Sequence, residues 1–523
     1  MPLPWLVVFL PWTGALLLLA LPRLRLAATV NIAISALSLL LAVLLLGTAH
    51  GEQGWTRVDA LNQPLLLLSA VIGLTTAVYS FGQLDAKGFD SLRLRAYHAA
   101  FQIFMGAQAL ALLADNMGVM WVAIEIATLA SVTMVAVHGT AAALEAAWKF
   151  FILCGVGIAL ALFGTILLYM AARPLIGHGD QGLSWAALRA VAAQCDAGLL
   201  NLAFVFLLLG YGAKAGLVPL HFWLPDAEAE GPVSISAVLS GLLLNAALVA
   251  VLRAKTIVAA HPDAMPPGPL LMAAGLASVL LAAFSLWRRR DARRFFAWSS
   301  IQHMGLAAFA FGMGGLAGNL AGLLHLLGHS LCKSAVFFGV GLATRLKGSQ
   351  QIAAIGGLVT SHPALGWSLV VAIAAVAGLP PFALFASEFL LLTEAVARWW
   401  WLGLALGFGV FVAVAAKINV LQLLCLGDAT PDHRDEPARL GPPRDPARLD
   451  HPHDPTRLDP PRNPTRLGPL RDPPQLNTTP PGRLAVLTTL GPLWLHLALA
   501  LVLGMALPAG GAALLAQAAE LLR

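Results

Sequence analysis

Residues 210–219, GYGAKAGLVP, decide the fold of this chain because they place Lys214 inside an apolar helix that glycine and proline interrupt. A second segment of the same kind, AGLPPFALFASEF at residues 377–389, carries Glu388 shortly after its break. A charge at the middle of a bilayer costs about 2.5–3.5 kcal/mol, so it is retained mainly where it serves a function. Two such segments in the two halves of one chain are typical of transporters built from internal repeats, with an ion site at the breaks.

The composition is that of a polytopic membrane protein. Of the 523 residues, 59% are hydrophobic and 11% are charged, whereas a soluble domain carries about 25% charged residues. The net charge of +6 would favour nucleic acid as a partner of a soluble protein. Here the basic residues lie in loops between apolar stretches, which is better explained by membrane topology, so no nucleic-acid partner is expected.

The four cysteines are widely separated and form no CxxC pair. They therefore predict neither a disulfide framework nor a metal cluster. The sequence also contains no iron–sulfur, flavin or nucleotide motif. We expect this chain to hold no cofactor and any redox chemistry to belong to partner chains.

Apolar stretches long enough to cross a bilayer predict an all-α polytopic membrane protein with about fourteen transmembrane helices. The predicted spans are residues 4–21, 27–47, 64–82, 97–114, 117–137, 147–171, 200–220, 234–254, 268–287, 296–314, 318–344, 364–390, 399–427 and 484–507. Basic residues cluster in the loops that follow odd-numbered spans. The positive-inside rule then places these loops in the cytoplasm and both termini outside the cytoplasmic (inner) membrane.

Internal similarity divides the chain further. Predicted helices 4–8 can be laid over helices 9–13, which brings the helix with Lys214 onto the helix with Glu388, and Asn245 onto Lys417. Because each unit has an odd number of helices, successive copies insert with opposite orientation, as in inverted repeats. The predicted units are residues 1–96, 97–254, 268–427, 429–482 and 484–507.

Residues 429–482 depart from the membrane pattern because a nine-residue unit related to DPARL (445–449) repeats along them. Proline at this density, mixed with arginine and aspartate, predicts an extended, solvated linker. A docking arm or a contact with anionic lipid is one interpretation. The composition favours the other, a tandem-repeat expansion tolerated in a cytoplasmic loop.

Lys214 and Glu125 are the first candidates for a proton pathway. A lysine in low-dielectric surroundings can exchange protons near neutral pH. Glu125 lies inside a predicted helix with apolar residues on every side, where a carboxylate without a partner is unfavourable. We expect the two side chains to pair. A static ion pair that fixes helix packing is the alternative.

His325, His329 and Lys333 follow an i, i+4, i+8 spacing, which places them on one face of a single helix. Titratable groups about 6 Å apart along a helix, bridged by water, suit proton hopping. Zinc is the weaker interpretation, because no third ligand is evident and the HExxH glutamate is absent. Core histidines that bind backbone carbonyls are the structural alternative. Glu388 would be the last group of this series of titratable side chains.

Weaker pathway candidates are Lys149, Asn245, His303 and Lys417. Lys149 also suits a role as a topological anchor because it lies near a predicted membrane boundary. The loop after the Lys214 helix contains further polar residues that we expect at the surface: His221, Asp226 and Glu228.

Seven motifs place these residues in a known family: NMGVMWVAIE (116–125), WKFFILC (148–154), KAGLVPLHFWLPDA (214–227), RDARR (290–294), SSIQHMG (299–305), HLLGHSLCK (325–333) and GLPP (378–381). Together they resemble the antiporter-like membrane subunits shared by respiratory complex I, membrane-bound nickel–iron hydrogenases and multisubunit cation/proton antiporters. The resemblance covers about residues 60 to 425. Within the family, the context of Glu125 and Cys154 resembles the F components of hydrogenase-4 assemblies.

The resemblance implies a fourteen-helix subunit with two inverted five-helix repeats and broken helices 7 and 12. It also implies a polar axis at mid-membrane through Glu125, Lys214, His325, His329, Lys333 and Glu388. Relatives in complex I often have a lysine or histidine where this chain has Asn245, so the central connection is expected to rely on water. The long lateral helix of the largest such subunits is not expected.

Three functions are compatible with these features. The first is a proton-translocating subunit of a hydrogenase-4-like or NADH:quinone oxidoreductase-like complex, with other membrane subunits and a peripheral redox arm as partners. The second is a subunit of a cation/proton antiporter that exchanges protons for a cation such as sodium without redox coupling. The third is a membrane scaffold that conducts no ions. In none of them does the chain carry a redox site or catalytic residues of its own.

Overall fold

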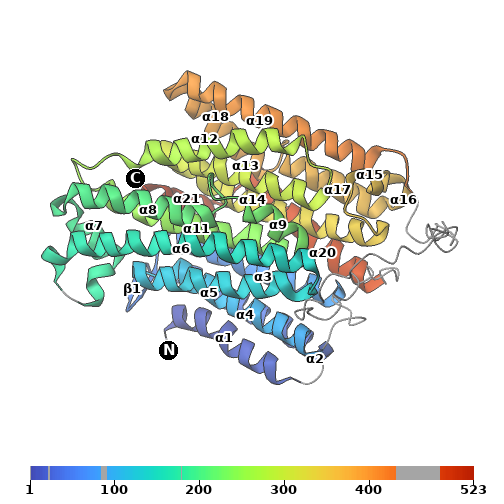
Figure 1. Cartoon of the computed structure of the whole chain (residues 1–523), viewed down its shortest axis with the longest axis horizontal. Coiled ribbons are helices and arrows are strands. Elements are labelled where there is room, and N and C mark those ends of the chain that lie inside the picture. The colour runs from blue at the N-terminus through green and yellow to red at the C-terminus, as the bar shows by residue number, and fades with distance from the viewer. Residues whose placement is uncertain (1, 22–23, 84–90, 178, 431–482) are drawn as a thin grey trace, which may run out of the picture.

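The computed structural model describes all residues except 1, 22–23, 84–90, 178 and 431–482, and the nonapeptide linker therefore lies outside the described residues. Most helices run side by side along one direction, as expected of a membrane bundle (Figure 1). The N-terminal half contains α1 (Leu3–Ala20), α2 (Leu24–Leu46), α3 (Asn62–Gln83), α4 (Ser91–Leu113), α5 (Met117–Val135), α6 (Ala141–Ile176), α7 (Trp185–Val191), α8 (Ala197–Lys214), α9 (Trp223–Glu230), α10 (Val233–Val238) and α11 (Leu244–Val258).

The second half follows and contains a second interruption. Its helices are α12 (Pro267–Leu286), α13 (Ala292–Met313), α14 (Gly315–Lys347), α15 (Ile352–Ile355), α16 (Leu358–Ser361), α17 (Pro363–Val376), α18 (Ala383–Arg398), α19 (Trp400–Leu421), α20 (Arg483–Met505) and α21 (Ala509–Leu521). Short 3₁₀ turns lie at Ala136–His138, Asp180–Leu183 and Ala192–Gln194, and π-helical turns at Leu239–Leu243 and Gln422–Leu426.

Within the described residues, twelve helices are long and apolar enough to cross a membrane, or up to thirteen if the bent pair at Ile352–Ser361 and Pro363–Val376 forms one span. This confirms a polytopic helical membrane fold, while the expected count of about fourteen stays a prediction. Two predicted spans account for the difference, 296–314 and 364–390. The first corresponds to α13, which carries arginine, glutamine and histidine, and the second is divided so that α18 has only 16 residues.

The first break lies at residues 215–222, so the predicted helix 200–220 ends earlier than expected. α8 stops at Lys214 because Gly216 adopts a left-handed conformation, with φ at 75°. The amide of Leu217 then donates to the carbonyl of Gly212 at 2.8 Å, which closes the end of the helix.

The second break, at residues 377–382, has the same geometry. Gly378 has a φ of 72°, and the amide of Leu379 donates to the carbonyl of Ala374 at 3.1 Å. The predicted helix 364–390 is therefore two helices, α17 and α18. The two charges lie on opposite sides of their breaks, since Lys214 ends the helix before the first break and Glu388 lies in the helix after the second.

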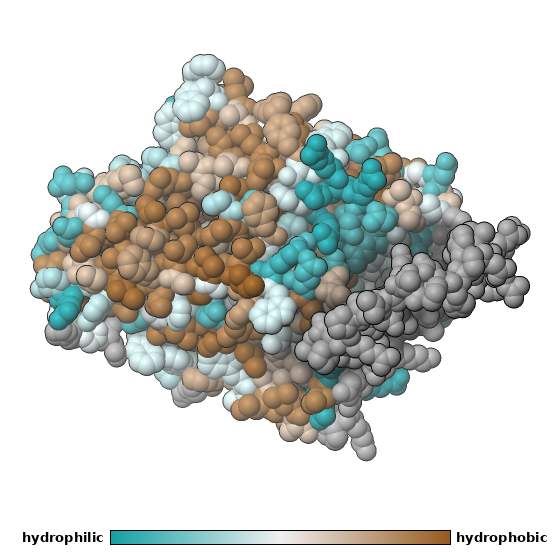
Figure 2. Space-filling model, viewed as in Figure 1, coloured by the Kyte–Doolittle hydropathy of each residue, from teal (hydrophilic) through white to brown (hydrophobic). Residues whose placement is uncertain are grey.

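Two elements form the centre of the bundle. The apolar windows of Val233–Val258 and of α14 are completely buried, whereas those of α1, α2 and α20 are less than half buried. The less buried helices expose apolar side chains that face lipid in a membrane protein. Apolar residues accordingly cover much of the face in Figure 2, with a large hydrophilic group to the right of centre and further hydrophilic residues along the left edge.

A hairpin and a buried ion pair lie between the N-terminal helices and the helices around the first break. β1 (Gly51–Gln53) pairs antiparallel with β2 (Thr56–Val58). Next to it, Asp59 forms an ion pair with the buried Arg253 of α11. The Arg253 guanidinium also stacks 4.3 Å from the Trp185 ring. These contacts connect the segment that precedes α3 to α7 and α11.

Candidate functional site

The first charged pair joins α5 to the end of α8. Lys214 is fully buried, and its Nζ donates to Oε2 of Glu125 at 3.0 Å and to the hydroxyl of Thr128. The carboxylate of Glu125 is partly exposed, at 22%. The predicted pairing of Lys214 with Glu125 is therefore present. Thr128 was not anticipated as a partner.

The end of α8 favours a cation at Lys214. The last carbonyls of a helix carry partial negative charge, which stabilises a nearby ammonium. The indole of Trp223 donates to the carbonyl of Ala213 at 2.8 Å, which holds α9 against this end. Lys214 therefore lies where the helix dipole and the Glu125 carboxylate act on one ammonium group.

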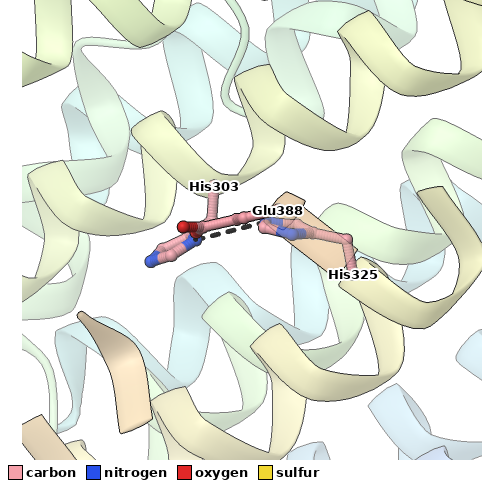
Figure 3. A group of neighbouring side chains, drawn as sticks. All are labelled: His303, His325 and Glu388. Atoms are coloured by element: carbon pink, nitrogen blue, oxygen red, sulfur yellow. Dashed lines mark hydrogen bonds and ion pairs between the residues drawn. The ribbon is translucent and has the colours of Figure 1, made fainter. Parts of the chain in front are cut away.

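A second cluster lies between α13, α14, α18 and α19. His303 and His325 meet at 3.2 Å through Nδ1 and Nε2, and Oε1 of Glu388 lies 3.7 Å from Nδ1 of His303. Figure 3 shows these three side chains converging from different helices. All three are buried. His325 also bonds the hydroxyl of Ser387 through Nδ1 at 2.9 Å.

Lys417 enters this cluster from α19. Its Nζ lies 3.0 Å from Nε2 of His303 and donates to Gln302 Oε1 at 2.8 Å and to the Val376 carbonyl at 3.0 Å. Val376 is the last residue of α17, so Lys417 caps the helix before the second break. His303, one of the weaker candidates from sequence, thus contacts both Lys417, another of them, and the predicted His325.

One set of histidine tautomers satisfies the bonds from Lys417 to Ser387. It leaves Nε2 of His303 without a proton for the Val376 carbonyl at 3.1 Å, and that carbonyl accepts from Lys417 instead. Lys417 donates to Nε2 of His303, Nδ1–H of His303 donates to Nε2 of His325, and Nδ1–H of His325 donates to Ser387. The Ser387 hydroxyl then donates to the Leu384 carbonyl at 2.9 Å. Every donor in this row points in one direction, which is the arrangement that a proton relay needs.

His329 and Lys333 continue along α14 as predicted. The ring of His329 lies 5.4 Å from that of His303, and neither of its nitrogens has a hydrogen-bond partner among the described residues. Lys333 donates to the carbonyl of Phe296 at 2.6 Å. The buried nitrogens of His329 require a partner such as water.

Asn245 of α11 is bonded to α14, the helix that carries His325 and His329. Its amide nitrogen donates to the hydroxyl of Ser330 at 2.8 Å and to the carbonyl of Gly241 at 3.0 Å. Its oxygen is buried with no partner in the part of the chain that the structure describes. The amide therefore links α11 to α14 by a neutral contact.

His221 and Glu228 are not at the surface as the sequence predicted, and Lys149 lies outside the buried clusters. His221 and Glu228, expected at the surface, are both buried, at 1% and 0% exposure, because α9 folds back between α6 and α13. Asp226 is partly exposed, and it pairs with Lys149 at 3.0 Å. Lys149 is itself exposed and also pairs with Glu145, which places it outside the buried clusters.

The tertiary structure also groups three possible metal ligands, which include His325 but not the His329 that the sequence paired with it. Ligand atoms of His303, His325 and Glu388 lie within 4.8 Å of one another. However, Lys417 lies 3.0 Å from the His303 ring, and a divalent cation would add two charges beside it with only one carboxylate nearby. Buried charge without compensation is costly, so the group suits proton exchange better than a metal ion.

A family model for the transmembrane part of NADH:quinone oxidoreductase and Mrp antiporter subunits matches residues 114–414. The chain belongs to this family. It is 48% identical over 430 residues to the hydrogenase-4 component F homolog of Methylacidiphilum infernorum, covering 82% of this chain and 90% of the relative. It is also 31% identical over 390 residues to NADH-quinone oxidoreductase subunit 14 of Thermus thermophilus, covering 74% of this chain and 80% of that subunit.

A solved structure of the Mrp complex from Dietzia sp. DQ12-45-1b has the same fold. The two chains superpose with a TM-score of 0.77 at 20% identity, over 100% of this chain and 97% of the other. These comparisons confirm the family resemblance and the multi-pass membrane fold. The solved structures with this fold come from the Mrp complex and from respiratory complex I of Thermus thermophilus.

Proposed function

We propose that this chain is the proton-translocating membrane subunit of an energy-converting oxidoreductase complex of the hydrogenase-4 or NADH:quinone oxidoreductase type. The observation that carries the proposal is the set of buried, contacting titratable groups at both helix breaks. Glu125 and Lys214 contact each other at the first break, and Lys417, His303 and His325 form a bonded row at the second. The relatedness to a hydrogenase-4 component F homolog supports the same class of complex.

In this proposal, electron transfer in a peripheral arm of the complex separates the Glu125–Lys214 pair, and Lys214 then releases its proton. At 3.0 Å and an effective dielectric of about 20, two unit charges attract by about 5–6 kcal/mol before the loss of hydration is counted. Redox chemistry in a peripheral arm would change the geometry of this pair. Moving one charge against 100 mV takes about 2.3 kcal/mol, so the interaction is large enough to drive the transfer.

The row at the second break then passes the proton across the membrane interior. Lys417 protonates Nε2 of His303, and the proton on Nδ1 moves to His325 as the bonds reverse. Glu388 stabilises the imidazolium that forms, because its carboxylate lies 3.7 Å from His303. Water beside Asn245 and His329 would connect this row to Lys214, since both side chains have unpartnered buried polar atoms among the described residues.

Proton uptake by vesicles that contain the assembled complex tests the proposal. Lys214→Ala and Glu125→Gln should abolish proton translocation that is driven by the electron donor. Lys149→Ala is the matched control, because this exposed lysine lies outside the buried clusters. Translocation that persists in Lys214→Ala, with only assembly impaired, would show that the chain is a scaffold.

Exchange of cations for protons without redox coupling is the second candidate, because the family model and the Mrp structure both include antiporter subunits. Vesicles without any electron donor distinguish the two functions. A sodium gradient that drives proton movement there, and that Lys214→Ala abolishes, would favour the antiporter. Redox-dependent movement without sodium would favour the first function.

We place the chain in the cytoplasmic membrane with the arginine-rich loop at residues 288–294 on the cytoplasmic side and both termini outside, following the positive-inside rule. Single cysteines introduced at exposed Arg288 and Gly54 should react with an impermeant thiol reagent from opposite sides. Labelling of both from the same side would contradict this topology.

A further inference from the structure

Glu228 is the most unusual ionisable group that the pathway described above does not use. It lies in α9, is 0% exposed, and neither carboxylate oxygen has a hydrogen-bond partner within the described part of the chain. A buried carboxylate without a partner is costly, and a native structure retains one mainly for a reason.

Two cations lie near this carboxylate on neighbouring helices, Arg293 of α13 and Lys333 of α14, and neither is bonded to it. Arg293 donates to the backbone carbonyl of Glu228 at 2.7 Å. Lys333 donates to the Phe296 carbonyl, which also accepts from the hydroxyl of Ser300. Glu228 is thus near two cations and forms an ion pair with neither.

Two hydroxyls lie near the carboxylate without a hydrogen bond to it. They belong to Ser240, in the π-helical turn after α10, and to Ser300 of α13, and they bond each other at 2.7 Å. A hydroxyl both donates and accepts, so it can relay a proton between groups that do not touch. π-helical turns inside α-helices frequently mark functional sites.

We propose that Glu228 and Lys333 form a second acid–base pair, which exchanges a proton directly or through Ser240 and Ser300. In the step, the Lys333 ammonium gives its proton to the Glu228 carboxylate, leaving a neutral amine and a neutral carboxylic acid, and the reverse step restores both charges. The first pair, Glu125–Lys214, is closed at 3.0 Å, whereas the second is open. The inference rests on the proposed proton translocation and adds a group to its pathway.

Glu230, two residues further along α9, has different surroundings from Glu228. It is partly exposed and pairs with Arg294 at 2.8 Å. Residues two apart do not share a face of a helix, so Glu230 lies outside the buried surroundings of Glu228.

A static role is the competing explanation, in which Glu228 only balances the charge of Arg293. Glu228→Gln, Glu228→Asp and Glu230→Gln in the assembled complex separate the two. Glu230→Gln is the matched control, because it neutralises an acid on the same helix that is partly exposed and already paired. Proton translocation in vesicles and the carboxylic-acid C=O band in infrared difference spectra are measured, with assembly checked by the amount of intact complex.

We expect Glu228→Gln to assemble, to lose translocation to the level of Lys214→Ala, and to lose a carboxylic-acid band that Glu230→Gln retains. Glu228→Asp should restore part of the translocation, since a shorter acid still carries a proton. Normal translocation in Glu228→Gln, while Lys214→Ala abolishes it, would overturn this inference and leave the proposed function intact. Normal translocation in both variants would overturn both proposals. Loss of assembly in Glu228→Gln that Glu228→Asp does not relieve would establish the static role.

Discussion

Gly378→Ala is the substitution whose effect can be worked out most fully from the structure. Gly378 lies in the second break with a φ of 72°, which costs about 1–2 kcal/mol for a residue with a side chain. Its new Cβ would lie 2.5 Å from Oε2 of Glu388, whereas ordinary contact begins at 3.4 Å. The alanine therefore acts on both the backbone and the carboxylate that supports His303.

The carboxylate has to move by 0.9 Å, the difference between 3.4 and 2.5 Å. If it moves away from His303, the separation grows from 3.7 Å to about 4.6 Å, and their attraction falls by about 0.9 kcal/mol at an effective dielectric of about 20. That is about a four- to fivefold smaller population of the charged His303–Glu388 pair. We expect proton translocation per electron transferred to fall by a similar factor.

Gly54→Ala is the control, because Gly54 has a nearly identical φ of 69° with nothing within 4 Å of the added Cβ. Both variants should lose about 1–2 kcal/mol of stability, measured by thermal unfolding of the purified complex. Only Gly378→Ala should translocate protons more slowly. Equal translocation by the two variants would refute the role assigned to the Glu388 carboxylate.

Other substitutions test separate contacts. Arg253→Met should lower the free energy of unfolding by about 3–5 kcal/mol, because it leaves Asp59 buried without its ion-pair partner. Complexes that assemble should still translocate protons. An unchanged melting temperature would contradict the stabilising role of this ion pair. Ser387→Ala removes the hydroxyl that accepts a hydrogen bond from His325 and should slow translocation about fivefold, which corresponds to about 1 kcal/mol for one hydrogen bond. Ser387→Thr keeps a hydroxyl and should retain most of the translocation rate. Lys417→Arg should abolish translocation, because arginine keeps its proton, and an active Lys417→Arg variant would show that a fixed positive charge suffices.

Several features of the site were predictable from local sequence. The helix breaks follow from glycine and proline inside apolar stretches, since only glycine readily adopts the left-handed conformation found at Gly216 and Gly378. The shared face of His325, His329 and Lys333 follows from helical periodicity. Glu125 had to find a cation because the residues around it are apolar.

The order of contacts in the buried row was not predictable from local sequence. His303 and Lys417 looked like minor candidates, yet α13 and α19 bring them within 3.0 Å of each other. Lys149 lies on a predicted helix as well, but it faces outward and pairs with surface acids. Helical periodicity says which residues share a face, but not which helix that face meets.

The sequence by itself thus determined the membrane class, the two broken helices and the charges beside them, because hydropathy and glycine conformation act within a few residues along the chain. Only the tertiary structure decided which polar residues are buried together. Glu228 follows a sharp turn and has acidic neighbours, which is typical of a surface loop, and it is buried solely because α9 folds back between α6 and α13. Burial depends on packing among helices that are distant in the sequence, and no local pattern records it.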